Sequence, residues 1–380
     1  MTSRSPSPQG MIPRYPNGLF SFDEGCVLVE DADVEIMELY MSLASTSPEI
    51  KSQDKDSGGL GFLSSNDSIL NINIDLTPPV LPTSEATAVS DGNKRGMKKK
   101  AKISSGGESK KIVESVNVQI QQDLGMLKGR GGDTGSVLWR SSLYLSTQIL
   151  RQSTYPDSYV NPIFHSEVLK KSSILELGAG TGLLSILLSG HCKKYTSSDR
   201  LENLKLVKRN LELNGINIGD RPSSDTLISN NFQKRTKLNG SSKNKFNPAE
   251  EKRYINLEEI DWTSISDQRK RHPELWISDF YMKNNKEEEE ESDLILAVDC
   301  IYNEFLIQPL IDTLGRYCKS GEKSVVWVVV ELRSADVLTM FLEKWMNDSS
   351  GPWTIIRLSE KMMGDWEGKK ARWVGWVGWR

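Results

Sequence analysis

The stretch Ile174-Leu-Glu-Leu-Gly-Ala-Gly-Thr-Gly182 determines the fold that we predict for this chain. Its first four residues are an apolar run typical of a short buried strand. Leu183–Leu188 follow the glycines and are apolar nearly all round, as expected of a buried helix. Glycine suits the turn between them because it reaches backbone angles closed to other residues and lets a ligand approach the main chain. The stretch therefore predicts a ligand-binding strand–loop–helix unit.

The spacing of the glycines separates the two ligand classes that use such a loop. A dinucleotide fold favours G-x-G-x-x-G, which would place a glycine where this chain has Leu183. The glycines lie instead at Gly178, Gly180 and Gly182, and the carboxylate of Glu176 comes two residues before the first. This pattern favours S-adenosylmethionine, which has no pyrophosphate and offers an amine, a carboxylate and a sulfonium.

The next two predicted strands end in residues suited to a nucleoside. The strand Tyr195–Ser198 leads to Asp199, whose carboxylate can accept hydrogen bonds from both ribose hydroxyls. The strand Tyr254–Ile260 leads to Trp262, whose indole can stack on an adenine at about 1–3 kcal/mol. Trp262 could instead fill the core. A methyltransferase is favoured over a dinucleotide-binding protein by the order of these features, which is strand, glycine loop, helix, strand and acid.

A fourth strand, Leu294–Val298, is followed by Asp299-Cys-Ile-Tyr302. This segment would lie at the carboxyl edge of the sheet, where α/β proteins place their chemistry. Enzymes that methylate base amino groups usually carry N/D-P-P-Y/F here, and this chain has no proline at those positions. The segment therefore counts against a nucleic-acid amine as the methyl acceptor.

Strands and helices alternate to the end of the chain, which predicts a doubly wound α/β sheet that is mostly parallel. A strand at Val325–Val330 and a helix over 335–347 are followed by two closely spaced strands, Thr354–Leu358 and Arg372–Trp379. These last two predict an antiparallel edge hairpin. The Trp- and Gly-rich segment Trp373–Trp379 could be a strand with alternating faces, or it could line the acceptor channel.

Composition indicates one domain with an extension. All ten tryptophans lie at or after Trp139. We expect residues 1–114 to be an N-terminal extension that is largely disordered, with a linker at 45–111 and a possible small docked element near 20–43. Residues 115–380 would form one domain with a polar insert at 219–252.

The formal net charge of −3 gives no global electrostatic reason to bind nucleic acid. Four cysteines without a C-x-x-C pair argue against a disulfide scaffold or a zinc ribbon, and we expect no metal site. No apolar run approaches the roughly 20 residues of a membrane helix. We expect a soluble, cytoplasmic monomer. The basic run within 98–102 is either a solvated linker or a patch that allows nuclear access or touches RNA.

Several ordered motifs resemble the seven-strand lysine methyltransferases of the methyltransferase-like 21 group, family 16. They are GSVLWRSSLYLSTQIL (135–150), ILELGAGTG (174–182), SSD (197–199), LEEIDW (257–262) and AVDCIYNE (297–304). The hallmark of this family, D/E-x-x-Y/F after the fourth strand, is met by Asp299 and Tyr302. The resemblance extends over residues 115–345.

The resemblance implies a Rossmann-like class I fold of seven strands and S-adenosylmethionine as cofactor. We take Asp299 to orient the acceptor amine and Tyr302 to shape the acceptor channel, although Tyr302 could simply support its loop. Glu176 joins the cofactor site from the residue pattern above. Carried over by motif, the family's cofactor contacts fall on Trp139, Gly178, Ala179, Gly180, Asp199, Trp262 and Val298.

Within the family, three segments resemble the fungal enzymes that methylate ribosomal lysines. They are AVDCIYNEFLIQPLIDTL (297–314), ELRSADVLTMFLEK (331–344) and the HPEL loop (272–275). This resemblance implies a lysine of a large-subunit ribosomal protein as acceptor. A lysine of a chaperone or elongation factor is the alternative within the family. A non-catalytic cofactor-binding or ribosome-binding module using Lys98–Lys102 is the alternative outside it.

Overall fold

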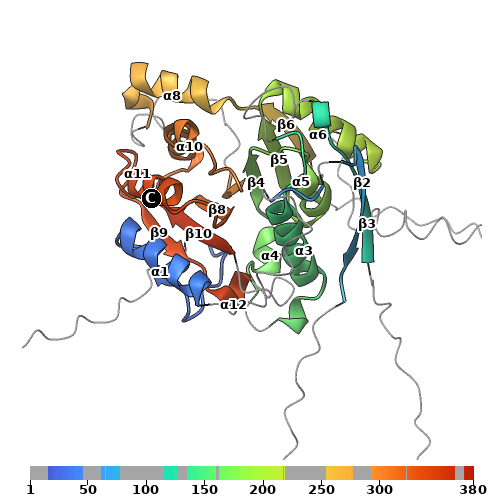
Figure 1. Cartoon of the computed structure of the whole chain (residues 1–380), viewed down its shortest axis with the longest axis horizontal. Coiled ribbons are helices and arrows are strands. Elements are labelled where there is room, and N and C mark those ends of the chain that lie inside the picture. The colour runs from blue at the N-terminus through green and yellow to red at the C-terminus, as the bar shows by residue number, and fades with distance from the viewer. Residues whose placement is uncertain are drawn as a thin grey trace, which may run out of the picture.

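The computed structural model describes residues 16–45, 61–64, 66–77, 115–125, 135–159, 162–216, 218, 254–276, 292–321, 323–363 and 372–380. They form an eight-stranded sheet with helices on both faces, flanked by a two-stranded ribbon (Figure 1). The predicted insert at 219–252 and the basic run at 98–102 lie outside the described residues. Among the described helices, none is both long and apolar enough to cross a membrane.

The main sheet has the order β1-β9-β10-β8-β7-β4-β5-β6. Its parallel part runs from β8 to β6, while β10 is antiparallel to both β8 and β9. The prediction of a mostly parallel α/β sheet with an antiparallel edge is therefore confirmed. The strands are β1 (Val27–Leu28), β4 (Ser173–Leu177), β5 (Lys194–Asp199), β6 (Tyr254–Glu259), β7 (Leu294–Val298), β8 (Val325–Glu331), β9 (Thr354–Arg357) and β10 (Trp373–Trp379).

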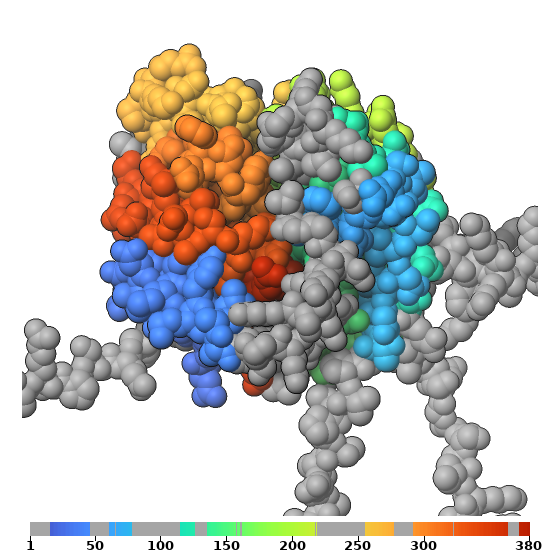
Figure 2. Space-filling view, viewed as in Figure 1, coloured from blue at the N-terminus to red at the C-terminus, as the bar shows by residue number. Residues whose placement is uncertain are grey.

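The sheet has eight strands where seven were predicted, because β1 pairs with the outer edge of β9. The helix that follows β1, α1 (Ala32–Ala44), begins at Asp31, whose side chain accepts a hydrogen bond from Val34 N. It packs against α11 near the other end of the chain. Figure 2 shows this N-terminal segment, in blue, against the orange and red C-terminal elements. Residues within 20–43 thus complete one edge of the sheet.

Two layers of helices bury the two faces of the sheet. Helices α3, α5 and α6 contribute to one apolar cluster, and α1, α10 and α11 contribute to the other. Helix α5 is buried along its whole length, as its sequence predicted. The helices are α3 (Arg140–Thr154), α4 (Ser166–Leu169), α5 (Leu183–Leu188), α6 (Leu201–Leu213), α8 (Trp262–Arg271), α10 (Glu304–Tyr317), α11 (Ala335–Met346) and α12 (Glu360–Met363), with short 3-10 turns at Pro156–Ser158, Ser189–His191 and Pro273–Trp276.

The interpretation of 45–111 as a linker is wrong for residues 69–75. They form β2 (Ile69–Asp75), which pairs antiparallel with β3 (Ser115–Gln121) in a separate ribbon. Leu70, Ile72 and Ile74 face the core while the residues between them are exposed, so the strand has the period of a half-buried sheet. The alternation was missed because β2 contains only aliphatic and small polar side chains and lies in a polar stretch without aromatic residues.

The C-terminal Trp/Gly segment is β10, a strand inside the sheet between β9 and β8. All seven of its residues are buried, and their side chains alternate between the two apolar clusters. A Cβ added at Gly378 would collide with the Trp345 ring, and one at Gly375 would lie 2.8 Å from Trp327 Nε1. The glycines therefore make room for tryptophans of neighbouring elements. This strand is not among the residues that line the cavity described below.

Candidate functional site

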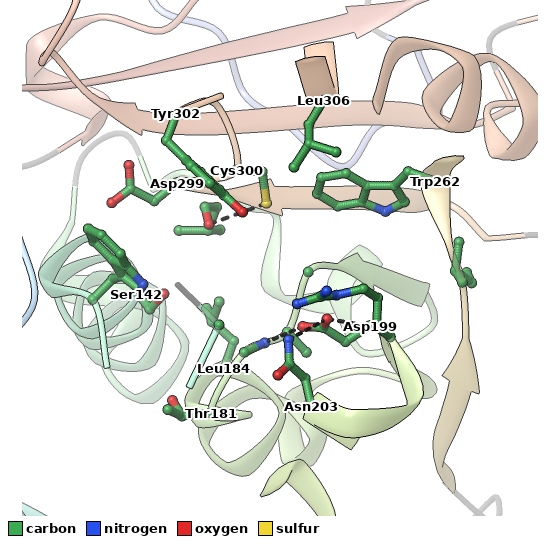
Figure 3. A pocket seen from close by; sticks show the side chains of 18 of the residues that line it. Ser142, Thr181, Leu184, Asp199, Asn203, Trp262, Asp299, Cys300, Tyr302 and Leu306 are labelled. Carbon is green, nitrogen blue, oxygen red and sulfur yellow. Dashed lines mark hydrogen bonds between the residues drawn. The ribbon is translucent and has the colours of Figure 1, made fainter. Parts of the chain in front are cut away.

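A cavity of about 400 Å³ opens at the carboxyl ends of β4, β5, β6 and β7 (Figure 3). The chain leaves β4 for β5 on one side and later returns to β7 on the other, so the cavity lies at the point where the strand order reverses. Glu176 does not line this cavity. Nine of the ten site residues predicted from the sequence do: Trp139, Gly178, Ala179, Gly180, Asp199, Trp262, Val298, Asp299 and Tyr302.

The glycine loop has the backbone that its sequence predicts. Gly178, Gly180 and Gly182 have φ of 71°, 56° and 77°, a region that side chains with a Cβ rarely adopt. A Cβ at Gly180 would also lie 3.2 Å from the carbonyl oxygen of Gly135. At Gly178 it would lie 3.0 Å from Cys300 Sγ. Both the conformation and the close packing therefore require glycine at the floor of the cavity.

Asp199 ends β5 and turns its carboxylate to the cavity. Its Oδ2 accepts a hydrogen bond from Gly180 N at 2.8 Å, and its Oδ1 accepts from Arg200 N and Asn203 Nδ2, both at 2.8 Å. Burial raises the pKa of Asp199, and these three donors oppose the rise. The donors hold the carboxylate in one orientation, joined to the glycine loop.

Asn203 is a cavity residue that the sequence interpretation missed. It lies on the first turn of α6, four residues after Asp199, and it is 3% exposed. Its Oδ1 has no hydrogen-bond partner among the described residues. A buried acceptor without a donor is costly, so this atom suits a hydroxyl or amino group of a ligand. The spacing of four from Asp199 is the one signal that could have identified it.

Glu176 is buried beside the cavity without lining it. Its Oε2 accepts a hydrogen bond from the Tyr195 hydroxyl at 3.0 Å, and only 2% of its surface is exposed. Burial raises the pKa of Glu176 to about 8, with the nearby Asp199 charge adding to the rise and the Tyr195 hydroxyl opposing it. The structure therefore places this carboxyl against Tyr195 of the neighbouring strand β5, and its contact with the cofactor stays a prediction.

Trp262 begins α8 at the mouth of the cavity. The N-cap of the helix is Asp261, whose side chain accepts from Thr263 N at 3.0 Å and so sets the direction in which the helix leaves β6. The indole is partly buried: it lines the cavity and also packs against one apolar cluster. Trp262 therefore has one part in the cavity, where it could stack on a base, and another part in the core, as the alternative interpretation predicted. Figure 3 shows Trp262 and Asp199 at one end of the cavity, and Asp299 and Ser142 at the other.

Asp299 has an unusual backbone conformation, and hydrogen bonds fix its carboxylate on both oxygens. Its φ is +58°, which is uncommon for a residue other than glycine. Arg333 Nη1 lies 2.5 Å from Oδ1 and Nη2 lies 2.6 Å from Oδ2, so the guanidinium binds both carboxylate oxygens. Ser141 Oγ donates to Oδ2 at 2.8 Å. The Asp299 side chain is 1% exposed, and its carboxylate is fixed in plane and paired in charge.

Arg333 is the second residue that the sequence interpretation missed. It lies just after β8, and its guanidinium also contacts Glu331 Oε2 at 2.7 Å and lies 4.9 Å above the ring of Trp139. Burial alone would lower its pKa, but the hydrogen bonds and charges of Asp299 and Glu331 outweigh burial and raise it. Arg333 is within the segment 331–344 that carries part of the resemblance, but the sequence does not pair it with Asp299, which is 34 residues away.

The outer rim of the cavity is apolar. Tyr302 lines the cavity and is 39% exposed, and Leu306 on the first turn of α10 lines it as well. Phe305 between them is 88% exposed, although Asn303 caps the helix by accepting from Phe305 N at 3.1 Å. Phe305 is on the same helix as the lining residue Leu306, so its ring is available to a molecule that approaches this end of the cavity.

Comparison with known proteins adds to this geometry. A family model described as lysine methyltransferase matches residues 117–233 and 254–347. The chain is similar to a protein of Candida glabrata named ribosomal lysine N-methyltransferase 5, with 27% identity over 346 residues, 84% of this chain and 90% of that protein. A Kluyveromyces lactis protein of the same name is 26% identical, over 81% of this chain and 86% of that protein.

A third relative carries a different name. A Schizosaccharomyces pombe protein named diaminohydroxyphosphoribosylamino-pyrimidine deaminase is 28% identical over 228 residues, which make up 60% of this chain. The chain spans 41% of that protein, less than half of its length. The deaminase name describes the whole of that longer relative, and the similarity concerns only a part of it.

Proposed function

The chain belongs to the lysine methyltransferase family, and we propose that the lysine it methylates is in a large-subunit ribosomal protein. As a member of this family it is a protein-lysine methyltransferase that uses S-adenosylmethionine. What supports the ribosomal acceptor is its similarity to two proteins named ribosomal lysine N-methyltransferase 5, which extends over most of both chains. Because the proposed acceptor is a ribosomal protein, we also propose that the protein acts in the cytoplasm.

The cavity fits the cofactor in the chemistry of its donors and acceptors. We propose that the glycine loop (178–182) receives the amino-acid part, because its residues 178–181 line the cavity and its glycines hold the main chain at positive φ. Asp199 and the unpartnered Oδ1 of Asn203 would accept hydrogen bonds from the nucleoside. Trp262 would stack on the base. All of these residues lie at the cofactor end of the cavity.

The reaction requires little acid–base catalysis by the protein. When bound, S-adenosylmethionine supplies a methyl group whose bond to sulfur breaks, leaving its electron pair on sulfur, as a bond to the lysine nitrogen forms. Only a neutral amine can attack, and deprotonating a lysine at pH 7 costs about 4–5 kcal/mol. Orientation can supply about 7–11 kcal/mol. The protein therefore mainly has to hold the neutral amine in line, a role we assign to Asp299.

The observation that carries the proposal is the composition of the cavity's two ends. One end presents the glycine loop and Asp199, and the other presents Asp299, Tyr302 and Leu306, the last on the same helix as the exposed Phe305. A polar site with apolar residues beside it suits a long side chain that enters from a protein surface. In this proposal Tyr302 forms the wall of the acceptor channel.

A labelling experiment tests the acceptor. The protein is incubated with methyl-labelled S-adenosylmethionine and ribosomes from cells that lack it, and the labelled residue is mapped by mass spectrometry. We expect label on a lysine of one large-subunit protein, and far slower labelling with Asp299→Ala. Label on a chaperone or elongation factor in whole lysate, with none on ribosomes, would contradict the ribosomal acceptor. Label on RNA would contradict lysine as the acceptor.

A further inference from the structure

We infer that Arg333 positions the carboxylate of Asp299 for the acceptor amine, and that residues 61–63 of the N-terminal region hold Arg333 in place. This inference rests on the proposed function, because it takes Asp299 as the group that faces the amine. It adds a positioning residue and a distant brace to the site. Neither follows from the motifs that identify the family.

The first step is the geometry of the pair. Asp299 follows β7 and Arg333 follows β8, and these strands are parallel neighbours in which Val298 is opposite Val329. Both residues therefore leave the sheet at the same edge. The two contacts at 2.5 and 2.6 Å fix the plane of the carboxylate, which a single contact would leave free to rotate. The positive φ of Asp299 brings its side chain to this position.

The second step is the balance of charge. The cluster contains the carboxylates of Asp299 and Glu331, the guanidinium of Arg333 between them, and Arg372, whose Nε lies 3.8 Å from Glu331 Oε1. A lone buried carboxylate would favour an acceptor lysine in its ammonium form, which cannot attack the methyl group. Arg333 offsets the charge of Asp299, and Ser141 Oγ and, at 3.4 Å, Glu331 N also donate to its oxygens. The paired carboxylate can therefore face the amine without strongly favouring the ammonium form.

The third step is the brace formed by residues 61–63. Leu63 N donates to Leu138 O at 2.8 Å, and Arg140 N donates to Gly61 O at 3.0 Å, so the segment is fastened to the start of α3. The ring of Phe62 packs edge-on against Trp139, whose ring in turn underlies Arg333. The guanidinium is therefore held between the carboxylates and an aromatic wall.

Gly61 shows how closely this segment fits Arg333. Its φ is +90°, and an added Cβ would collide with Arg333 Nη2 and lie 2.7 Å from Glu331 Oε2. Only a residue without a side chain leaves the guanidinium its place. The N-terminal region thus contributes to the acceptor end of the cavity, although Gly61 and Asp299 are 238 positions apart in the sequence.

The first test replaces Arg333 in the full-length protein. We expect Arg333→Met to lower kcat by roughly 10- to 100-fold, because a small displacement of a positioning group costs that much. Counting active sites by cofactor binding corrects for misfolded protein, and the Kd for S-adenosylmethionine and the KM for the acceptor should stay within about twofold. Arg333→Lys should recover part of kcat. In an Asp299→Ala background, Arg333→Met should cause no further loss.

Arg357→Met is the matched control. Arg357 also pairs with a buried carboxylate, Glu35 at 2.9 Å, but it lies on β9 away from the cavity. We expect Arg357→Met to lose about as much stability as Arg333→Met, but to keep the wild-type kcat per cofactor-binding site. A kcat for Arg333→Met equal to that of the wild type would overturn the inference. So would an equal loss in Arg357→Met. If the wild-type protein methylated no ribosomal lysine, the proposed function itself would be wrong.

The second test acts from the N-terminal segment. Gly61→Ala should lower kcat in the same pattern as Arg333→Met, with cofactor binding preserved. Gly18→Ala is its control, because Gly18 also has a positive φ, of 71°, but an added Cβ there meets nothing within 4 Å. Both variants incur backbone strain, and only Gly61→Ala displaces the guanidinium. Wild-type kcat in Gly61→Ala would show that residues 61–63 do not hold Arg333 in place.

Discussion

The two ends of the cavity are built in different ways. The cofactor end is nearly continuous in sequence: the loop at 178–182 and Asp199 lie within 22 residues, joined by one hydrogen bond from Gly180 N. The acceptor end is collected from distant segments, with Asp299 bound by Ser141 and Arg333. A binding site for a common cofactor can be encoded locally, whereas the acceptor end depends on the whole fold to bring its parts together.

The largest effect should come from the acceptor end. Asp299→Ala should lower kcat by about 10²- to 10³-fold, the usual cost of removing a preorganised polar group from an active site. Cofactor affinity, measured by calorimetry, should survive because Asp199 and the glycine loop are untouched. Asp299→Asn keeps the shape of the side chain without its charge. Turnover that survives in both variants would show that the carboxylate does not orient the amine.

Beneath the cofactor end, Glu176 should make stability depend on pH. Its pKa is raised to about 8 in the folded state from an ordinary value of 4.5, so the folded state holds the extra proton. Its contribution to stability is therefore present at low pH and lost as pH rises through about 8. Glu176→Gln mimics the protonated form, so at pH 9 it should be more stable than the wild type by about 2–4 kcal/mol. At pH 4 the difference should vanish.

Denaturant unfolding at several pH values measures this effect. Glu38→Gln is a suitable control, because Glu38 is on the surface of α1 with its side chain about half exposed. If the gap between Glu176→Gln and the wild type did not widen with pH, the carboxyl would be ionised in the folded protein. Glu176 would then have to be solvated or bound to a cation.

Asp199→Asn should weaken the cofactor end without affecting the acceptor end. The amide cannot accept hydrogen bonds from Gly180 N, Arg200 N and Asn203 Nδ2 together, because one of its two atoms is a donor. We expect the Kd for S-adenosylmethionine to rise about 10- to 100-fold. At saturating cofactor, kcat should stay close to the wild-type value. A fall in kcat with unchanged Kd would mean that the two ends do not act separately.

The smallest effect should come from the rim. Phe305→Ala removes a ring that is 88% exposed, so it should leave folding and cofactor binding unchanged. If the ring contacts the protein acceptor, its KM should rise about 3- to 10-fold. Leu213→Ala, at an exposed position on the far end of α6, serves as the control and should leave KM unchanged. An unaltered KM in Phe305→Ala would remove this ring from the acceptor surface.

The sequence interpretation was most accurate where structure is local. Continuous apolar runs identified β4, α5 and β8, since each buries residues that are adjacent in the chain. It did not identify β2, because that strand contains only aliphatic and small polar side chains and lies in a polar stretch. Its burial becomes evident only when β3, some 40 residues later, pairs with it. For the same reason Phe62, close to β2, could not be connected with the acceptor end.

For this protein, the sequence alone determined the α/β class, the cofactor loop and the acid that follows it. These depend on backbone angles, apolar period and short spacings, which neighbouring residues specify. Only the tertiary structure revealed the pairing of Asp299 with Arg333, and the brace that Gly61 allows. An ion pair between two strand ends depends on the order of the strands in the sheet and on the positive φ of Asp299. The residues next to Asp299 and Arg333 in the sequence specify neither.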